Sequence, residues 1–295
     1  MIVAGERLLS FKLEPNKPKL RLPPGSWDTH CHVLGPTDRF PYASTAPVNF
    51  VDAPKEKLFA LHAMLGIERC VIVHTAAHGF DLRVTEDALA AKGGAYLGVA
   101  LLPTTVDNAE LRRLDRLGFR GARYNFMPHL HRDYSFEQVM DFLPRLADVG
   151  WHLQIHMEGT MLPDLEPKLE RSPVPVVVDH IARVDAGLGL EQPQFKSLLR
   201  LMQSDKFWVK VSGCDRITRT GPPYADAVPF ARKLVTEFPD RVVWGTDWPH
   251  PHHKGPIPDD GQLVDLIAEM APTDELRRKL MADNPRRLYD MRATH

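Results

Sequence analysis

Short apolar runs alternate with segments of helical spacing along almost the whole chain. Eight runs have the continuous aliphatic and β-branched character of strands that are buried on both faces. They cover residues 26–33, 70–75, 96–101, 119–125, 152–157, 174–180, 208–212 and 242–246. Between these runs, apolar residues recur at the spacing of one helix face, as Leu58, Leu61 and Leu65 do.

Eight strands, each followed by a helical segment, predict an α/β protein built as a (β/α)8 barrel. A doubly wound open sheet gives the same alternation, but no glycine-rich phosphate loop follows the first strand. Many of the 26 prolines lie near the start of the chain and between the predicted elements, where they interrupt regular structure. We predict one domain over residues 1–295, with residues 1–25 as an irregular N-terminal arm.

Composition and charge narrow the class of protein. Lys and Arg number 37 against 38 Asp and Glu, so no basic excess is present to neutralise nucleic-acid phosphates. No apolar run approaches the roughly 18 residues of a membrane span, and the first 15 residues lack the apolar core of a signal peptide. Three cysteines without a Cys-x-x-Cys pair fit a reducing compartment. We expect a cytoplasmic enzyme, monomer or homodimer, that binds neither nucleic acid nor membrane.

Polar residues gather at the ends of the predicted strands, where the active sites of such barrels lie. The first strand ends with His30 and His32, which point to the same face because they are alternate residues of a strand. The sixth strand ends with His180, and the eighth strand is followed by Asp247. We predict that these four side chains meet at the mouth of the barrel as the catalytic residues.

Segments along nearly the whole chain resemble the amidohydrolase superfamily, in its amidohydrolase 2 type. They are residues 28–36 (DTHCHVLGP) and 244–251 (WGTDWPHP), with further matches in residues 118–126, 178–183, 221–223 and 284–289. Within the superfamily, the chain is most similar to the 2-pyrone-4,6-dicarboxylate lactonase group. This resemblance implies a distorted (β/α)8 TIM barrel that hydrolyses a small carboxylated lactone, often in the catabolism of aromatic compounds.

Hydrolysis of a lactone needs an activated water molecule and a polarised carbonyl group. An ionised Asp247 can take a proton from water as the general base. His30, His32 and His180 can donate hydrogen bonds to the carbonyl oxygen and stabilise the oxyanion that forms there. The resemblance implies the same roles for these positions.

Arginines are the main candidates for binding the substrate. The resemblance implies that Arg123 and Arg216 hold substrate carboxylates, and Arg183 lies close to them. A guanidinium offers a carboxylate a planar, bidentate fork, although an ion pair with a neighbouring aspartate is the alternative. Further candidates for contacts with the substrate are Thr75, His78, Tyr42, His129 and His250.

One departure from the lactonase group concerns the substrate. The group carries a second arginine just after the fourth strand, where this chain has Pro128, His129 and Leu130. One carboxylate contact is then weakened or replaced by a histidine. Another carboxylated or sulfonated muconolactone, or a sugar-acid lactone, also fits this pattern.

A second departure concerns metal ions. The fifth strand ends in His156, where the lactonase group has a tyrosine. Together, His30, His32, His156 and Asp247 offer three nitrogen ligands and one oxygen ligand, which suit one zinc-like divalent ion. The lactonase group works without metal, whereas most of the superfamily binds one or two ions. We expect one ion or none.

Two other activities use a similar set of residues. A metal-dependent decarboxylase of the same superfamily is one alternative, and a sugar-acid lactone hydrolase or isomerase is the other. Arg123, Arg216 and the segment 244–251 favour the hydrolysis of a carboxylated lactone.

Overall fold

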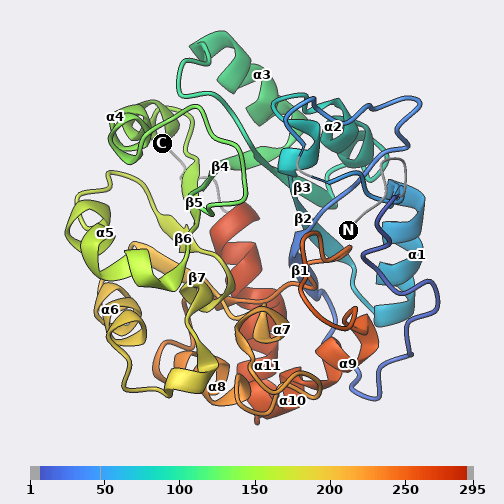
Figure 1. Cartoon of the computed structure of the whole chain (residues 1–295), viewed down its shortest axis with the longest axis vertical. Coiled ribbons are helices and arrows are strands. Elements are labelled where there is room, and N and C mark those ends of the chain that lie inside the picture. Colours follow the sequence, from blue (N-terminus) through green and yellow to red (C-terminus); the bar gives the residue numbers. More distant parts are fainter. Residues whose placement is uncertain (1–6, 47, 291–295) are drawn as a thin grey trace.

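Eight parallel strands lie side by side in the order β1 to β8, with helices around them (Figure 1). This computed structural model describes residues 7–46 and 48–290. Backbone hydrogen bonds from Thr29 N to Trp244 O (2.9 Å) and from Asp247 N to His30 O (2.7 Å) join β1 to the segment after β8. The predicted distorted (β/α)8 barrel is therefore confirmed. Its strands are β1 Trp27–Cys31, β2 Arg69–Val73, β3 Tyr96–Ala100, β4 Phe119–Asn125, β5 His152–His156, β6 Val176–Val178, β7 Phe207–Lys210 and β8 Val242–Val243.

All eight predicted strands are present, but several are shorter than the apolar runs that predicted them. The strand β4 has the predicted bounds, whereas β6 and β8 keep only three and two residues. The lost residues include their carboxyl ends, and left-handed backbone conformations follow β6 and β8: His180 has φ +48° and Asp247 has φ +62°. These strands therefore end where the polar side chains turn towards one another.

Helices connect consecutive strands, as predicted. The apolar face predicted for the first helix is buried through Leu58, Leu61 and Leu65. The α-helices are α1 Lys55–Leu65, α2 Arg83–Ala90, α3 Asn108–Leu117, α4 Phe136–Ala147, α5 Leu162–Leu169, α6 Pro193–Leu201, α7 Cys214–Ile217, α8 Val228–Glu237, α9 Asp260–Asp265, α10 Ile267–Met270 and α11 Asp274–Arg278. Short helical turns are η1 Ala76–His78, η2 Gly159–Met161, η3 His180–Arg183, η4 Ala186–Leu188, η5 Lys279–Asp283 and η6 Arg286–Asp290.

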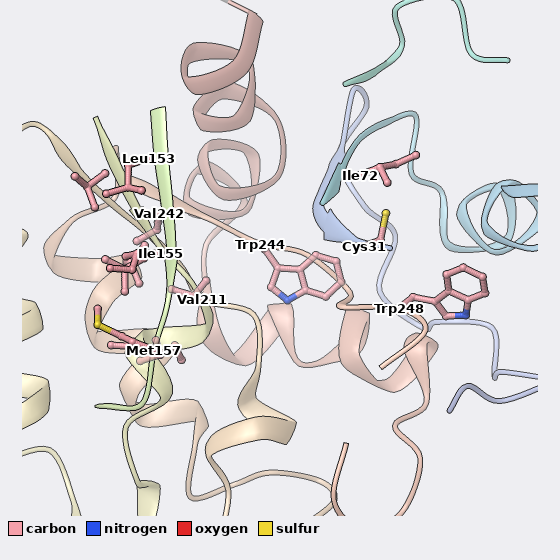
Figure 2. Close-up of a cluster of buried hydrophobic side chains, with 14 of the residues drawn as sticks. Cys31, Ile72, Leu153, Ile155, Met157, Val211, Val242, Trp244 and Trp248 are labelled. Carbon is pink, nitrogen blue, oxygen red and sulfur yellow. The ribbon is translucent and has the colours of Figure 1, made fainter. Parts of the chain in front are cut away.

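Apolar side chains from distant parts of the chain form one large buried cluster. Figure 2 shows part of it, with Leu153 and Ile155 of β5 near Val242, and with Trp244 between this group and Cys31 of β1. A second cluster joins the first three strands to the C-terminal turn η6. The part of the chain that the structure describes contains no candidate membrane-spanning helix.

The predicted N-terminal arm is described from residue 7 onwards. Residues 7–25 contain no helix or strand apart from an isolated bridge between Leu8 and Phe50. The arm is held to the barrel by side chains, as when Asp265 Oδ1 accepts a hydrogen bond from Lys19 N (2.7 Å). Residues 1–6 and 291–295, which the predicted single domain includes, lie outside the described residues.

Candidate active site

A small cavity of about 50 Å³ lies at the carboxyl ends of the strands. It continues into an open groove of about 770 Å³, and the two share His129, Arg183, Arg216 and His252. Active sites of (β/α)8 barrels lie at this end of the barrel. The predicted residues that line the small cavity are His32, Thr75, Arg123, His129, His156, His180, Arg183, Arg216 and Asp247.

Asp28 joins the two segments that carry the predicted catalytic residues. Its Oδ1 accepts hydrogen bonds from His30 N (2.9 Å) and Thr246 N (3.1 Å), and its Oδ2 accepts one from Thr246 Oγ1 (2.6 Å). Gly245 lies against the same place, because a Cβ atom there would be 2.5 Å from His30 N. This close packing sets the position of β1 relative to Asp247.

Asp247 lies at the centre of the predicted catalytic residues. Its Oδ1 is 3.2 Å from His32 Nε2 and 3.7 Å from His30 Nε2, and its Oδ2 is 3.8 Å from His180 Nε2. Each of the four residues is buried, with at most 2% of its surface exposed. The structure thus brings all four residues together around one carboxylate.

Left-handed backbone conformations carry two of these side chains into the cavity. The four residues of η3, His180–Arg183, have φ between +48° and +54°, and Asp247 has φ +62°. Such conformations cost roughly 1–2 kcal/mol for each residue that is not glycine. They persist where the surrounding structure determines them strongly, as functional sites often do. The turn lets both His180 and Arg183 line the cavity.

Arg216 is bound to Asp247 and is not free for a substrate. Its Nε and Nη2 atoms lie 2.7 Å and 2.6 Å from Asp247 Oδ2, and its Nη1 donates to Pro251 O (3.0 Å). Burial by itself would raise the pKa of Asp247, but the Arg216 cation, with smaller effects from His180 and His32, holds that pKa well below its usual range. Asp247 is therefore ionised, and a substrate carboxylate would have to compete with it for Arg216.

The other two predicted arginines differ in their ion pairs. Arg123 donates from Nε to Asp179 Oδ2 (2.8 Å). Arg183 lines both the cavity and the groove, and no described acidic side chain forms a salt bridge with it. Burial and the nearby Arg216 cation lower the pKa of Arg183 to about 10, so it remains charged at neutral pH. Arg183 is thus the guanidinium most available to an anion.

The two histidines of the His-x-His pair have different partners on Nδ1. His32 Nδ1 is 2.7 Å from Val73 O, which only accepts, so this nitrogen carries a proton. His30 Nδ1 lies 3.2 Å from Lys210 Nζ and 3.3 Å from Asp179 Oδ1. Burial and the Lys210 cation hold the pKa of His30 well below its usual value, although Asp179 opposes them.

Lys210 and Gln154 belong to a buried network that the sequence analysis missed. Lys210 Nζ donates to Gln154 Oε1 (2.9 Å), and Gln154 Nε2 donates to Asp179 Oδ1 (2.9 Å). Burial lowers the pKa of Lys210 to about 8, against the attraction of Asp179. One feature of the sequence could have indicated this network. Lys210 lies within the predicted buried strand 208–212, and lysine is almost never fully buried without a partner.

Three predicted substrate contacts lie outside the small cavity. His78 and Tyr42 line a separate cavity of about 480 Å³, where His78 Nε2 accepts a hydrogen bond from Gly35 N (3.2 Å). His250 is completely buried, and its Nε2 lies 3.1 Å from Asp260 Oδ1. His250 therefore does not line the small cavity, and its contact with a substrate stays a prediction.

Three of the four predicted metal ligands form a group. Ligand atoms of His30, His32 and Asp247 lie within 4.8 Å of one another, a spacing that can hold one ion. His156 is outside this group. Its Nδ1 lies 3.1 Å from Asn125 Oδ1, and its buried Nε2 has no hydrogen-bond partner among the described residues.

Known proteins resemble this chain over almost its whole length. A family model described as Amidohydrolase matches residues 27–291. The chain is 43% identical over 290 residues to 2-pyrone-4,6-dicarboxylate hydrolase of Comamonas testosteroni, with 95% of each chain covered. It is 39% identical over 274 residues to 4-sulfomuconolactone hydrolase of Hydrogenophaga intermedia, covering 91% of this chain and 89% of the relative. An apo crystal structure from Agrobacterium tumefaciens has a TM-score of 0.81 at 27% identity, covering 93% and 99% of the two chains.

Buried histidines should make the fold less stable in acid. Burial lowers the pKa of His74 and His152 to about 3 and that of His180 to about 4. Between pH 6.5 and 4 the unfolded chain binds protons at these rings and the folded chain does not, so the free energy of unfolding falls as the pH falls. We expect a loss of roughly 3 kcal/mol per histidine, measured by urea unfolding from pH 7 to 4.

The variant His74→Gln should lose less stability over this pH range than the wild type. His131→Gln is the matched control, because the His131 side chain is 53% exposed, and its pH dependence should equal that of the wild type. If the free energy of unfolding of His74→Gln fell with pH as steeply as that of the wild type, His74 would not be a source of the acid sensitivity.

Proposed function

The chain belongs to the amidohydrolase family, and we propose that it is a hydrolase that opens the ring of a carboxylated lactone. The observation that carries this proposal is the meeting of Asp247 with three imidazoles. All of these residues except His30 line one cavity, together with Arg183, for which the described residues offer no ion-pair partner. An ionised carboxylate, N–H donors and a cation for the substrate are what ring opening by water requires. The names of the two relatives support this substrate class.

In this proposal, Asp247 takes a proton from the attacking water. The hydroxide adds to the carbonyl carbon of the lactone, and the carbonyl oxygen becomes the oxyanion of a tetrahedral intermediate. When the ring C–O bond breaks, the leaving oxygen takes up the proton that Asp247 accepted. A low pKa makes Asp247 a weak base. A substrate carboxylate that draws Arg216 away from Asp247 would raise this pKa when the substrate binds, and Asp247 would become a stronger base.

His30 and His180 are the proposed hydrogen-bond donors to the carbonyl oxygen. His32, whose Nδ1 proton faces Val73 O, joins them only when its Nε2 is also protonated. Burial lowers the pKa of His180 to about 4, so this ring is neutral at pH 7 and carries one N–H group. Buried donors stabilise an oxyanion strongly, because water does not compete with them and they are oriented before the reaction begins.

Arg183 is the proposed first contact for a substrate carboxylate. His129 belongs to the segment 128–130, where the resemblance implies a second arginine in the lactonase group. Its ring centroid lies 5.1 Å from that of His252. Burial lowers the pKa of His129, so it offers a neutral hydrogen-bonding group. We therefore propose a substrate with one carboxylate on Arg183 and a second polar substituent near His129.

We infer that the chain's own side chains carry out the reaction without a resident divalent ion. Asp247 is already paired with Arg216, whose Nε lies 2.7 Å from it, and the Lys210 ammonium lies 3.2 Å from His30 Nδ1. A divalent ion held by His30, His32 and Asp247 would add two positive charges beside these two cations, which is electrostatically unfavourable. The same repulsion weighs against the metal-dependent decarboxylase.

The variant Asp247→Asn should lose nearly all turnover. An amide cannot accept the proton of water, so we expect kcat to fall by at least about 1,000-fold, within the range for loss of a general base. Ring opening of 2-pyrone-4,6-dicarboxylate, followed by proton release at fixed pH, measures this. Far-ultraviolet circular dichroism should match the wild type. Turnover within about twofold of the wild type would refute the role of Asp247.

The variant Arg183→Met should raise KM for carboxylated lactones by roughly 10- to 100-fold, because it removes a charged hydrogen bond. The kcat value should change much less. Arg219→Met is the matched control: Arg219 lines the same groove, but it is paired with Asp185 and its side chain is 68% exposed. An unchanged KM in Arg183→Met, or an equal rise in both variants, would contradict the assignment.

Removal of metal ions should leave activity intact. After dialysis against a strong chelator, we expect full turnover in protein that elemental analysis shows to contain far less than one ion per chain. Activity that disappears with the metal and returns with stoichiometric zinc would show that His30, His32 and Asp247 hold a working ion.

A further inference from the structure

Lys210 is a charged residue at the end of β7, and its side chain is completely buried inside the barrel. Its Nζ contacts three groups within hydrogen-bond distance: Thr29 O at 2.8 Å, Gln154 Oε1 at 2.9 Å and His30 Nδ1 at 3.2 Å. The roles proposed above leave this residue without a function. Its third contact, however, reaches one of the proposed oxyanion donors.

An ammonium group has three N–H donors and no acceptor, so each of its partners has to accept. The carbonyl oxygen of Thr29 accepts the first hydrogen bond. The amide oxygen of Gln154 accepts the second, and the orientation of this amide follows from its Nε2, which donates to Asp179 Oδ1 (2.9 Å). The third N–H points to His30 Nδ1, which accepts only if that nitrogen carries a lone pair.

The opposite tautomer of His30 leaves a buried donor without an acceptor. If Nδ1 carried the proton, it could donate to Asp179 Oδ1 at 3.3 Å. The third N–H of Lys210 would then lose this acceptor, and Asp179 Oδ1, at 3.7 Å from Nζ, is beyond hydrogen-bond distance. Asp179 does not need His30, because Arg123 Nε (2.8 Å) and Gln154 already donate to it.

We propose that Lys210 is a positioning residue, which holds His30 in the tautomer with its proton on Nε2 and so provides an N–H donor beside Asp247. His30 Nε2 is buried, lies 3.7 Å from Asp247 Oδ1 and has no hydrogen-bond partner among the described residues. This nitrogen therefore still needs a hydrogen-bond partner, which an oxygen atom of the substrate or of the attacking water would supply. This inference rests on the proposed lactone hydrolysis for its catalytic meaning.

His32 provides an internal comparison. Its Nδ1 faces the carbonyl oxygen of Val73 at 2.7 Å, so its proton is on Nδ1 and its Nε2 needs a second proton before it can donate. His30 and His32 lie two residues apart and both approach Asp247, but they have opposite partners on Nδ1. Lys210 thus makes His30 a donor while its ring is neutral.

The tautomer can be read directly by nitrogen-15 NMR of protein labelled at its histidines. The signals of His30 are identified by their loss in His30→Gln. In the wild type at pH 7 we expect His30 Nε2 to show a protonated signal and Nδ1 an unprotonated one. In Lys210→Met we expect the proton on Nδ1 and none on Nε2, because Asp179 becomes the remaining partner of Nδ1. A proton on Nδ1 in the wild type would overturn the proposal, and this holds even if Lys210→Met does not fold.

Kinetics separate positioning from a merely structural role. Lys210→Met should lower kcat at least about tenfold and change KM less than about threefold. In a His30→Gln background the same substitution should lower kcat less than about twofold, because Lys210 then has no imidazole to orient. Lys196→Met is the control: Lys196 is paired with Glu191 and its side chain is 50% exposed, so kcat should not change. An equal loss in both backgrounds would overturn the proposal.

The two proposals fail in different ways. The spectra require no substrate, so they test the control of His30 by Lys210 even if no carboxylated lactone is hydrolysed. A wild type that shows the expected tautomer but lacks lactonase activity would refute the proposed function alone. An active wild type with the proton on His30 Nδ1 would refute the role of Lys210 alone.

Discussion

The ion pair between Asp247 and Arg216 is the interaction on which the whole site depends. A carboxylate that is almost completely buried next to three imidazoles would take up a proton if no cation compensated it. Arg216 supplies that cation from α7, and it binds a single oxygen of the carboxylate. The other oxygen remains directed at His30 and His32. The pair thus keeps Asp247, the proposed base, ionised and leaves one of its oxygen atoms free of Arg216.

A second group of buried charges lies around His30. Asp179 is compensated by Arg123 and Lys210, and Gln154 links the carboxylate to the ammonium. Because every polar atom in such a network needs a partner, the network leaves few ways to orient the imidazole next to it. Two groups of paired charges therefore lie at the site. In the roles proposed above, one of them orients the donor His30 and the other keeps the base Asp247 ionised.

The barrel and much of the site were predictable because their signals are local. Continuous apolar runs mark strands that are buried on both faces, and alternate residues of one strand share a face, so His30 and His32 had to point the same way. The strand ends were less predictable. The strands β6 and β8 end earlier than predicted, and the segments after them contain the left-handed residues His180–Arg183 and Asp247. Such conformations are uncommon in residues other than glycine.

The sequence by itself determined the closed ring of strands, the end of it that carries the chemistry, and the residue types that meet there. Only the tertiary structure decided which charged side chains are already paired with one another. It paired Arg216 with Asp247, placed Lys210 against His30 and turned His250 towards Asp260. It also left Arg183 without an acidic partner among the described residues. The physical reason is that an ion pair or a tautomer depends on distances of about 3 Å between segments far apart in the chain. No spacing along a single strand contains that information.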